Sequence, residues 1–174
     1  LQRVVRLDWG YAHSLDAPVW QLIVERLPAT ALLMLSAIAL ALALGVAMGM
    51  AAALHARRWL DGLISVLALL CYATPAFMVG IGMILLFTVQ LHWLPMSGMS
   101  SLYDDSTLWA RALDMARHLV MPMVSLSLFY VAIYTRLMRA AMLEVMPLDY
   151  VRTARSKGLV PARIVWHHMA RNAL

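Results

Sequence analysis

The sequence predicts an all-α membrane protein built as a polytopic bundle of helices. Of its 174 residues, 63% are hydrophobic and 13% are charged, whereas a soluble domain is roughly 45–50% apolar and about 25% charged. The mean hydropathy is +0.77, and two stretches of 28 and 30 residues contain no charge. A short soluble chain could not cover so much apolar surface. We therefore expect most of this surface to face lipid or other helices.

Three uncharged segments are predicted to cross the membrane. The first, 27–54, is longer than the roughly 20 helical residues that cross a hydrocarbon core of about 30 Å. The second is 62–91. The third, 118–135, is expected to extend towards Met138, because Arg136 can reach the polar interface from a helix end.

The distribution of Lys and Arg predicts how these spans are oriented, since basic residues in short connections are retained in the cytoplasm. Nine of the fourteen lie in 55–61 and after 135, on one side of the membrane, and five lie in 1–26 and 92–117. Four tryptophans lie at or beyond span ends, where an aromatic belt is typical: Trp20, Trp59, Trp93 and Trp109.

This pattern divides the chain into three parts. Residues 1–26 are expected to form an external N-terminal segment. Residues 27–140 are expected to hold the transmembrane helices and their loops, and 141–174 a cytoplasmic loop followed by the start of another helix. The chain begins with Leu1 and shows no signal-peptide pattern, so we expect the start of the gene product to be missing.

The first span carries a small residue at every fourth position. Such a row lets a neighbouring helix approach closely in lipid. Because Ala and Gly are common in membrane helices, lipid exposure stays open as an alternative. The predicted packing row is Ala37, Ala41, Gly45, Gly49 and Ala53.

The second span is expected to bend at Pro75, which removes a backbone donor, and Thr74 can satisfy the carbonyl that this frees. Two interpretations stay open, a wall of a transport pathway and an ordinary tolerated kink. None of the three spans contains Asp, Glu, Lys or Arg. This argues against a proton or sodium relay and leaves open a transporter that takes its energy from elsewhere.

Other chemical signals are weak. The single Cys71 cannot form an intrachain disulfide. His167 and His168 are adjacent and point to different faces of a helix, so we expect no metal site there. Asp104 and Asp105 could attract a cation, although solvated loop carboxylates are far commoner. No phosphate loop, nucleophile elbow or acid pair is visible, so we expect no catalytic residue, no cofactor and no ATP hydrolysis in this chain.

The C-terminal region predicts a short amphipathic helix of about three turns, with Pro147 at its first position and Gly158 as its left-handed C-terminal cap. Pro161 then starts another helix. Apolar side chains of the short helix share one face and polar ones another, namely Tyr150, Val151 and Ala154 against Arg152, Arg155 and Ser156. A helix of this kind can bind anionic lipid or dock on a soluble partner. Nucleic acid is the weakest of the three possibilities, because the basic residues flank apolar segments.

The residues 150–159 and 168–174 resemble the signature of permeases in binding-protein-dependent ABC importers, most closely the dipeptide, oligopeptide and nickel group. In that family the region is the EAA loop, whose coupling helix sits in a cleft of a cytoplasmic ATPase. The chain departs from Glu-Ala-Ala-x-x-x-Gly by having Arg152, as the peptide group allows, and Ala170 and Arg171 replace its closing Leu-Pro. The resemblance implies these ATPase-coupling residues: Tyr150, Val151, Arg152, Thr153, Ala154, Arg155, Lys157, Gly158 and Leu159.

The resemblance covers nearly the whole chain. Residues 7–10 and 25–30 are similar to the family's external entry into a membrane helix, 93–98 to its external turn, and 118–122 to the start of the next helix. The family usually has six spans. The resemblance therefore implies that this chain holds three, without the first span and the last two.

The resemblance also implies a set of partners. These are a second permease subunit, identical or homologous, two cytoplasmic ATP-binding subunits, an external solute-binding protein and the lipid bilayer, without nucleic acid. The location would be the inner membrane of a bacterium or archaeon, with solute passing through the spans. The competing interpretation is a non-transporting anchor whose basic tail binds lipid.

Overall fold

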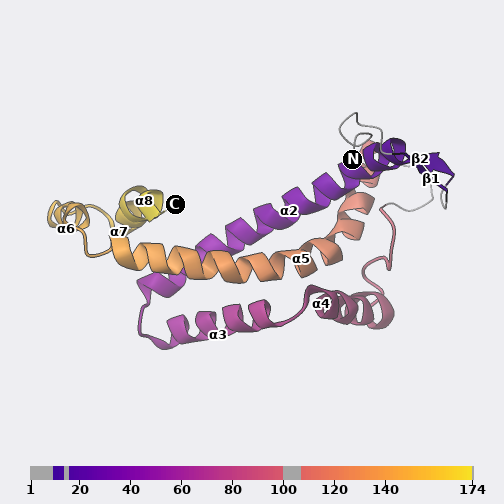
Figure 1. The fold of residues 1–174 in the computed structure, drawn as a ribbon. Helices are drawn as coiled ribbons and strands as arrows, with labels where there is room; N and C mark the ends of the chain where they lie inside the picture. Colours follow the sequence, from indigo (N-terminus) through magenta and orange to yellow (C-terminus); the bar gives the residue numbers. More distant parts are fainter. Residues whose placement is uncertain (1–9, 14–15, 100–106, 174) are drawn as a thin grey trace.

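The computed structural model describes residues 10–13, 16–99 and 107–173, and these form an all-α membrane bundle (Figure 1). Two long helices, α2 and α5, lie against each other, and two shorter ones, α3 and α4, each contact α5. Further helical segments follow at the C-terminal end. The bounds are α2 Val19–Leu54, α3 Trp59–Ala73, α4 Ala76–Met83, η1 Ile84–Gln90, α5 Leu108–Val145, α6 Asp149–Ser156, α7 Pro161–Arg163, η2 Ile164–Ala170 and α8 Arg171–Ala173.

A small hairpin precedes the first long helix. Strand β1, Tyr11–Ala12, pairs antiparallel with β2, Ala17–Pro18. The backbone N–H of Val19 donates to the carbonyl of Gly10, 3.1 Å away, which joins this hairpin to the start of α2. Sequence reasoning did not predict it, since two-residue strands leave no periodic pattern.

Both long helices extend beyond the uncharged windows that predicted them. Helix α2 begins at Val19 instead of residue 27, and α5 covers Leu108–Val145 instead of 118–135. At 1.5 Å per residue, their 36 and 38 residues give lengths of about 54 and 57 Å. A charged residue ends the uncharged segment that was used to predict a span, but the helix itself continues through it. Arg136 and Arg139, which were counted with the tail, therefore lie in α5.

Helices α2 and α5 run parallel and approach backbone to backbone. An added Cβ at Gly45 would lie 2.6 Å from Cβ of Tyr134, and one at Gly49 would lie 2.6 Å from the carbonyl oxygen of Thr135. These distances leave no room for a side chain at either glycine. All five small residues that recur every fourth position are buried here: Ala37, Ala41, Gly45, Gly49 and Ala53.

The second predicted span is broken rather than bent. Helix α3 ends at Ala73 and α4 begins at Ala76, and their axes differ by 96°. Thr74 takes an extended conformation, with φ −85° and ψ 122°, because a residue before proline is disfavoured in the helical region. Its N–H and hydroxyl both donate to the carbonyl of Leu70, at 3.0 and 2.8 Å. The carbonyl that Pro75 deprives of its helical donor is that of Cys71, four residues earlier, whereas both bonds from Thr74 go to Leu70, and the helix does not continue.

By length and composition, α2 and α5 can each cross a membrane, and the α3–α4 pair counts as a third span only if both parts are taken together. Large apolar side chains stay exposed along these helices, for example Leu35 of α2 and Leu69 of α3 at 68% and 59% exposure. Such surface is expected of a helix that faces lipid or further helices.

Replacing Gly49 with alanine should loosen the α2–α5 contact, since the new methyl group would overlap the Thr135 carbonyl. We expect a net loss of about 1–3 kcal/mol in the free energy of unfolding, the usual range for overpacking. The measurement is denaturant unfolding of the full-length protein in detergent micelles. Gly62→Ala is the matched control, because a Cβ at Gly62 meets nothing within 4 Å. Equal stability of the Gly49→Ala and Gly62→Ala proteins would contradict the close approach.

Candidate functional site

Helix α6 packs on η2 and is joined through an apolar cluster to the ends of the long helices. Its residues Val151 and Ala154 are only 0% and 5% exposed. Residues of α2, α5, α6 and η2 all contribute to this cluster, in which α6 packs on η2 and η2 packs on α5. The cluster consists of Met50, Ala53, Met138, Met142, Val145, Val151, Ala154, Ile164, Met169 and Ala170.

The opposite face of α6 is polar and open. Arg152, Arg155 and Lys157 are exposed, and within the part of the chain that the structure describes none of them has an ion-pair partner. Tyr150, expected on the apolar face, is 38% exposed and lies at its margin. Helix α6 therefore has an exposed basic surface at this end of the bundle.

Helix α6 is shorter than the expected three turns. It begins at Asp149, because Met146 and Pro147 form the turn that follows α5, and Leu148 is extended with ψ 149°. The N–H of Leu148 bonds to the carbonyl of Val145 in this turn, at 3.2 Å. Pro147 is therefore outside the helix rather than at its first position. Eight residues remain, about two turns.

Gly158 ends α6 and redirects the chain. Its φ of +72° is the left-handed conformation that sequence reasoning expected. The N–H of Gly158 donates to the carbonyl of Arg155, and that of Leu159 to Ala154, at 3.0 and 3.4 Å. This is the Schellman pattern of helix termination. Pro161 then occupies the first position of α7, as expected.

A partly buried ion pair lies near this end of the bundle, and sequence reasoning missed it. Asp61 in the first turn of α3 is 6% exposed. Arg139 of α5 donates from Nε to its Oδ1 at 2.7 Å and from Nη2 to its Oδ2 at 2.8 Å. The backbone N–H of Arg57 donates to Oδ2 at 3.0 Å. The available signal was an acidic and a basic residue at span ends on the same side, since such groups pair with one another in membranes.

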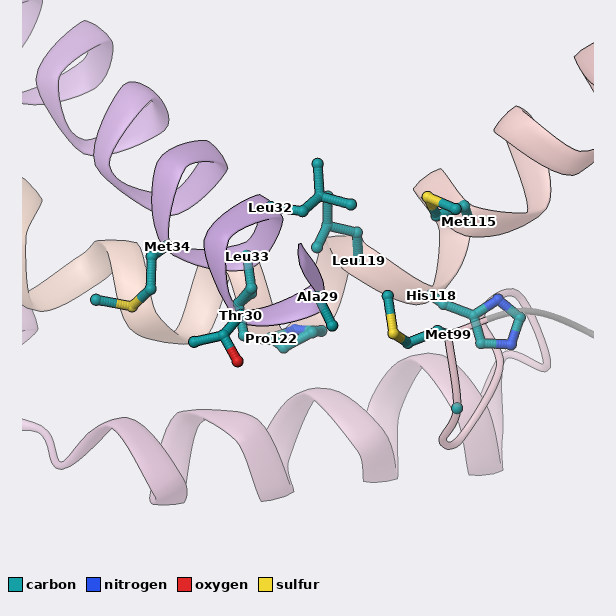
Figure 2. A pocket seen from close by; sticks show the side chains of 11 residues that line it. Ala29, Thr30, Leu32, Leu33, Met34, Met99, Met115, His118, Leu119 and Pro122 are labelled. Carbon is teal, nitrogen blue, oxygen red and sulfur yellow. The ribbon is translucent and has the colours of Figure 1, made fainter. Parts of the chain in front are cut away.

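Cavities lie along the helices. One of about 270 Å³ lies between the first half of α2 and α5, with Thr30, Met115 and His118 in its wall (Figure 2). His118 is held by a 2.8 Å hydrogen bond between its Nδ1 and the carbonyl of Asp114. A larger one, about 810 Å³, lies between α3 and α5 and includes Tyr72 and Arg136.

The remaining predicted positions carry little chemistry. Thr74 and Pro75 form the break between α3 and α4 described above. His167 and His168 belong to η2, and among the described residues no three His, Cys, Asp or Glu side chains gather as a metal site would require. The loop carboxylates Asp104 and Asp105 and the external motif 7–9 lie outside the described residues.

Comparison with known proteins agrees with this arrangement. Residues 45–174 match the family described as the inner membrane component of binding-protein-dependent transport systems. This match includes the C-terminal end of α2, the ion pair and the whole of α6.

Several curated proteins are similar to the chain. One, from Brucella abortus, is named as a peptide transport system permease protein; it is 38% identical over 174 residues, which are 100% of this chain and 54% of that protein. The di/tripeptide transport system permease protein DppB of Pseudomonas aeruginosa is 40% identical over 170 residues, covering 90% of this chain and 51% of DppB. The chain thus spans about half the length of these relatives. The family match and these identities confirm the resemblance, and the chain belongs to the family of inner membrane components of binding-protein-dependent transport systems.

Proposed function

We propose that the protein forms part of the transmembrane pathway of an ATP-driven ABC importer for peptides or similar small solutes. An external binding protein would deliver the solute, a second permease subunit would complete the pathway, and two cytoplasmic subunits would hydrolyse ATP. The names of the similar proteins support a peptide as the transported solute. The multi-pass architecture supports a membrane subunit.

The observation that carries this proposal is the two-sided α6. Its apolar side, with Val151 and Ala154, is buried in the apolar cluster, where α6 packs on η2, while its basic side is open. A partner that binds the open side can therefore act on the ends of α2 and α5 through η2 and this cluster. In this proposal the residues 150–155 and 157–159 couple the bundle to the ATPase, and closure of the ATPases alternates the pathway between inward-open and outward-open states.

The orientation is also part of the proposal. Trp20, Trp59 and Trp93 are exposed and lie at helix ends, as interface anchors do. With the basic side in the cytoplasm, residues 1–26 are external, 27–140 hold the spans, and 141–174 form the cytoplasmic coupling loop and the next helix. The break at 74–75 then lies along the pathway, where two helix segments can change their angle.

Orientation can be tested with single cysteines in a Cys71→Ala background. Arg58 and Ser97 are exposed and lie in connections at opposite ends of α3–η1. We expect a membrane-impermeant thiol reagent on intact spheroplasts to label Cys at 97 and not at 58. Permeabilised cells should label at both positions, which controls for reactivity. Labelling at 58 alone in intact spheroplasts would reverse the orientation.

Gly158→Val should uncouple transport, because a β-branched residue resists the left-handed conformation at this position. Gly158→Asn is the matched control, since Asn tolerates that conformation. The complete complex is reconstituted in liposomes, and ATPase co-purification and uptake of radiolabelled dialanine are measured. We expect loss of both with Val and retention with Asn, with equal membrane insertion. Normal uptake by the Val variant would contradict a role for the cap in coupling.

Arg155→Glu separates partner docking from the competing lipid-anchor function. Arg155 is exposed, so reversing its charge leaves the apolar cluster intact. If α6 docks on an acidic surface of the ATPase, co-purification and uptake should fall while membrane insertion stays normal. If α6 only binds anionic headgroups, the variant should instead keep uptake and lose affinity for vesicles containing anionic lipid.

A further inference from the structure

Asp61 connects three segments that are otherwise separate in the sequence. It belongs to α3, it accepts two hydrogen bonds from Arg139 of α5, and it accepts one from Arg57 in the turn after α2. Arg57 has a φ of +64°, which a non-glycine residue adopts only when its surroundings hold it there. This carboxylate of α3 therefore accepts hydrogen bonds from both the α2–α3 turn and α5.

The ion pair lies next to the apolar cluster that includes Val151 and Ala154 of α6. Met138, the neighbour of Arg139, belongs to the apolar cluster with Met142 and Val151. A Cβ added at Gly49 would lie 2.7 Å from Cβ of Met138 and 3.1 Å from the N of Arg139. The backbone at Arg139 is thus packed against α2, and the adjacent Met138 belongs to the cluster that also contains Val151 of α6.

We propose that Asp61 is a positioning residue that makes α3 follow α5 when α6 moves. The inference rests on the proposed function, in which α6 receives movement from an ATPase. Helix α3 also packs on α5 through Ile64 and Ala68, but apolar contacts permit sliding. The paired carboxylate and guanidinium fix direction and register, because both hydrogen bonds of the fork must stay aligned. Movement at α6 then reaches the break after Ala73, where α4 can change its angle to α3.

The test compares Asp61→Asn, Arg139→Gln and the double variant in the complete complex, reconstituted in liposomes with its ATPase and binding protein. Arg136→Gln is the matched control, since Arg136 lies on the same helix, is exposed and has no ion-pair partner among the described residues. We expect each single variant to assemble and hydrolyse ATP, while dialanine uptake per ATP falls about tenfold, a usual size for coupling between sites. The control should match the wild type.

A spectroscopic measurement distinguishes positioning from a general structural role. Spin labels at Val66 of α3 and Leu137 of α5, both exposed, report the distance between the helices in a Cys71→Ala background. In the wild type this distance should be the same without nucleotide and after trapping with ATP and vanadate. In Asp61→Asn it should change on trapping.

The double variant gives the decisive outcome, because it leaves no buried charge unpaired. If Asp61 positions α3, the double variant still assembles and is still uncoupled, with the altered spin-label distance. Restored uptake per ATP in the double variant, or normal uptake in Asp61→Asn, would overturn the inference. A wild-type complex without ATP-dependent uptake would instead contradict the proposed function.

Discussion

The close approach of α2 and α5 is the contact on which the rest of the structure depends. Two glycines leave the backbones with no side chain between them, at Gly45 and Gly49. In lipid the hydrophobic effect does not drive helices together, so close packing of this kind contributes most to their association. This contact brings the ends of both helices to one place. The apolar cluster that seats α6 forms there.

The packing of α6 in the apolar cluster shows how a very short helix can have a defined direction. Eight residues are too few for a stable isolated helix. Its orientation comes from Val151 and Ala154 in the cluster and from the Gly158 cap that turns the chain towards Pro161. Asp149 in its first turn and Arg155 in its last suit the helix dipole. A partner at its basic face therefore meets a surface whose angle to the bundle is set from within.

The bundle also combines a firm contact and a break in the same segment. The Asp61–Arg139 pair holds the start of α3, and the Thr74–Pro75 step ends it with a change of direction of 96°. The family match covers both features. A segment fixed at one end and broken at the other can transmit a displacement and change its own angle. In the proposed function, alternating access requires this behaviour.

The sequence alone determined that this is a helical membrane protein, approximately where its apolar segments lie, that small residues recur along 37–53, and that residues 150–159 resemble a coupling loop. Each of these features can be predicted from composition, from a local periodicity or from a sequence motif. The Gly158 cap could also be predicted, since only the local backbone decides it. The end of α2 at Leu54 and the start of α7 at Pro161 also agree with the prediction, but the start of α2 and both ends of α5 do not. Hydropathy detects lipid-compatible residues, whereas α2 and α5 continue through charged ones.

Only the tertiary structure decided the break at Thr74–Pro75 and the pairing of Asp61 with Arg139. A proline is compatible with a bend or a break, and the surrounding packing selects between them. The ion pair joins residues 78 positions apart, and no local pattern encodes such a distance. Sequence reasoning placed one partner in a loop and the other in a tail. Their contact exists because the α2–α5 packing and the α2–α3 turn bring the start of α3 beside α5.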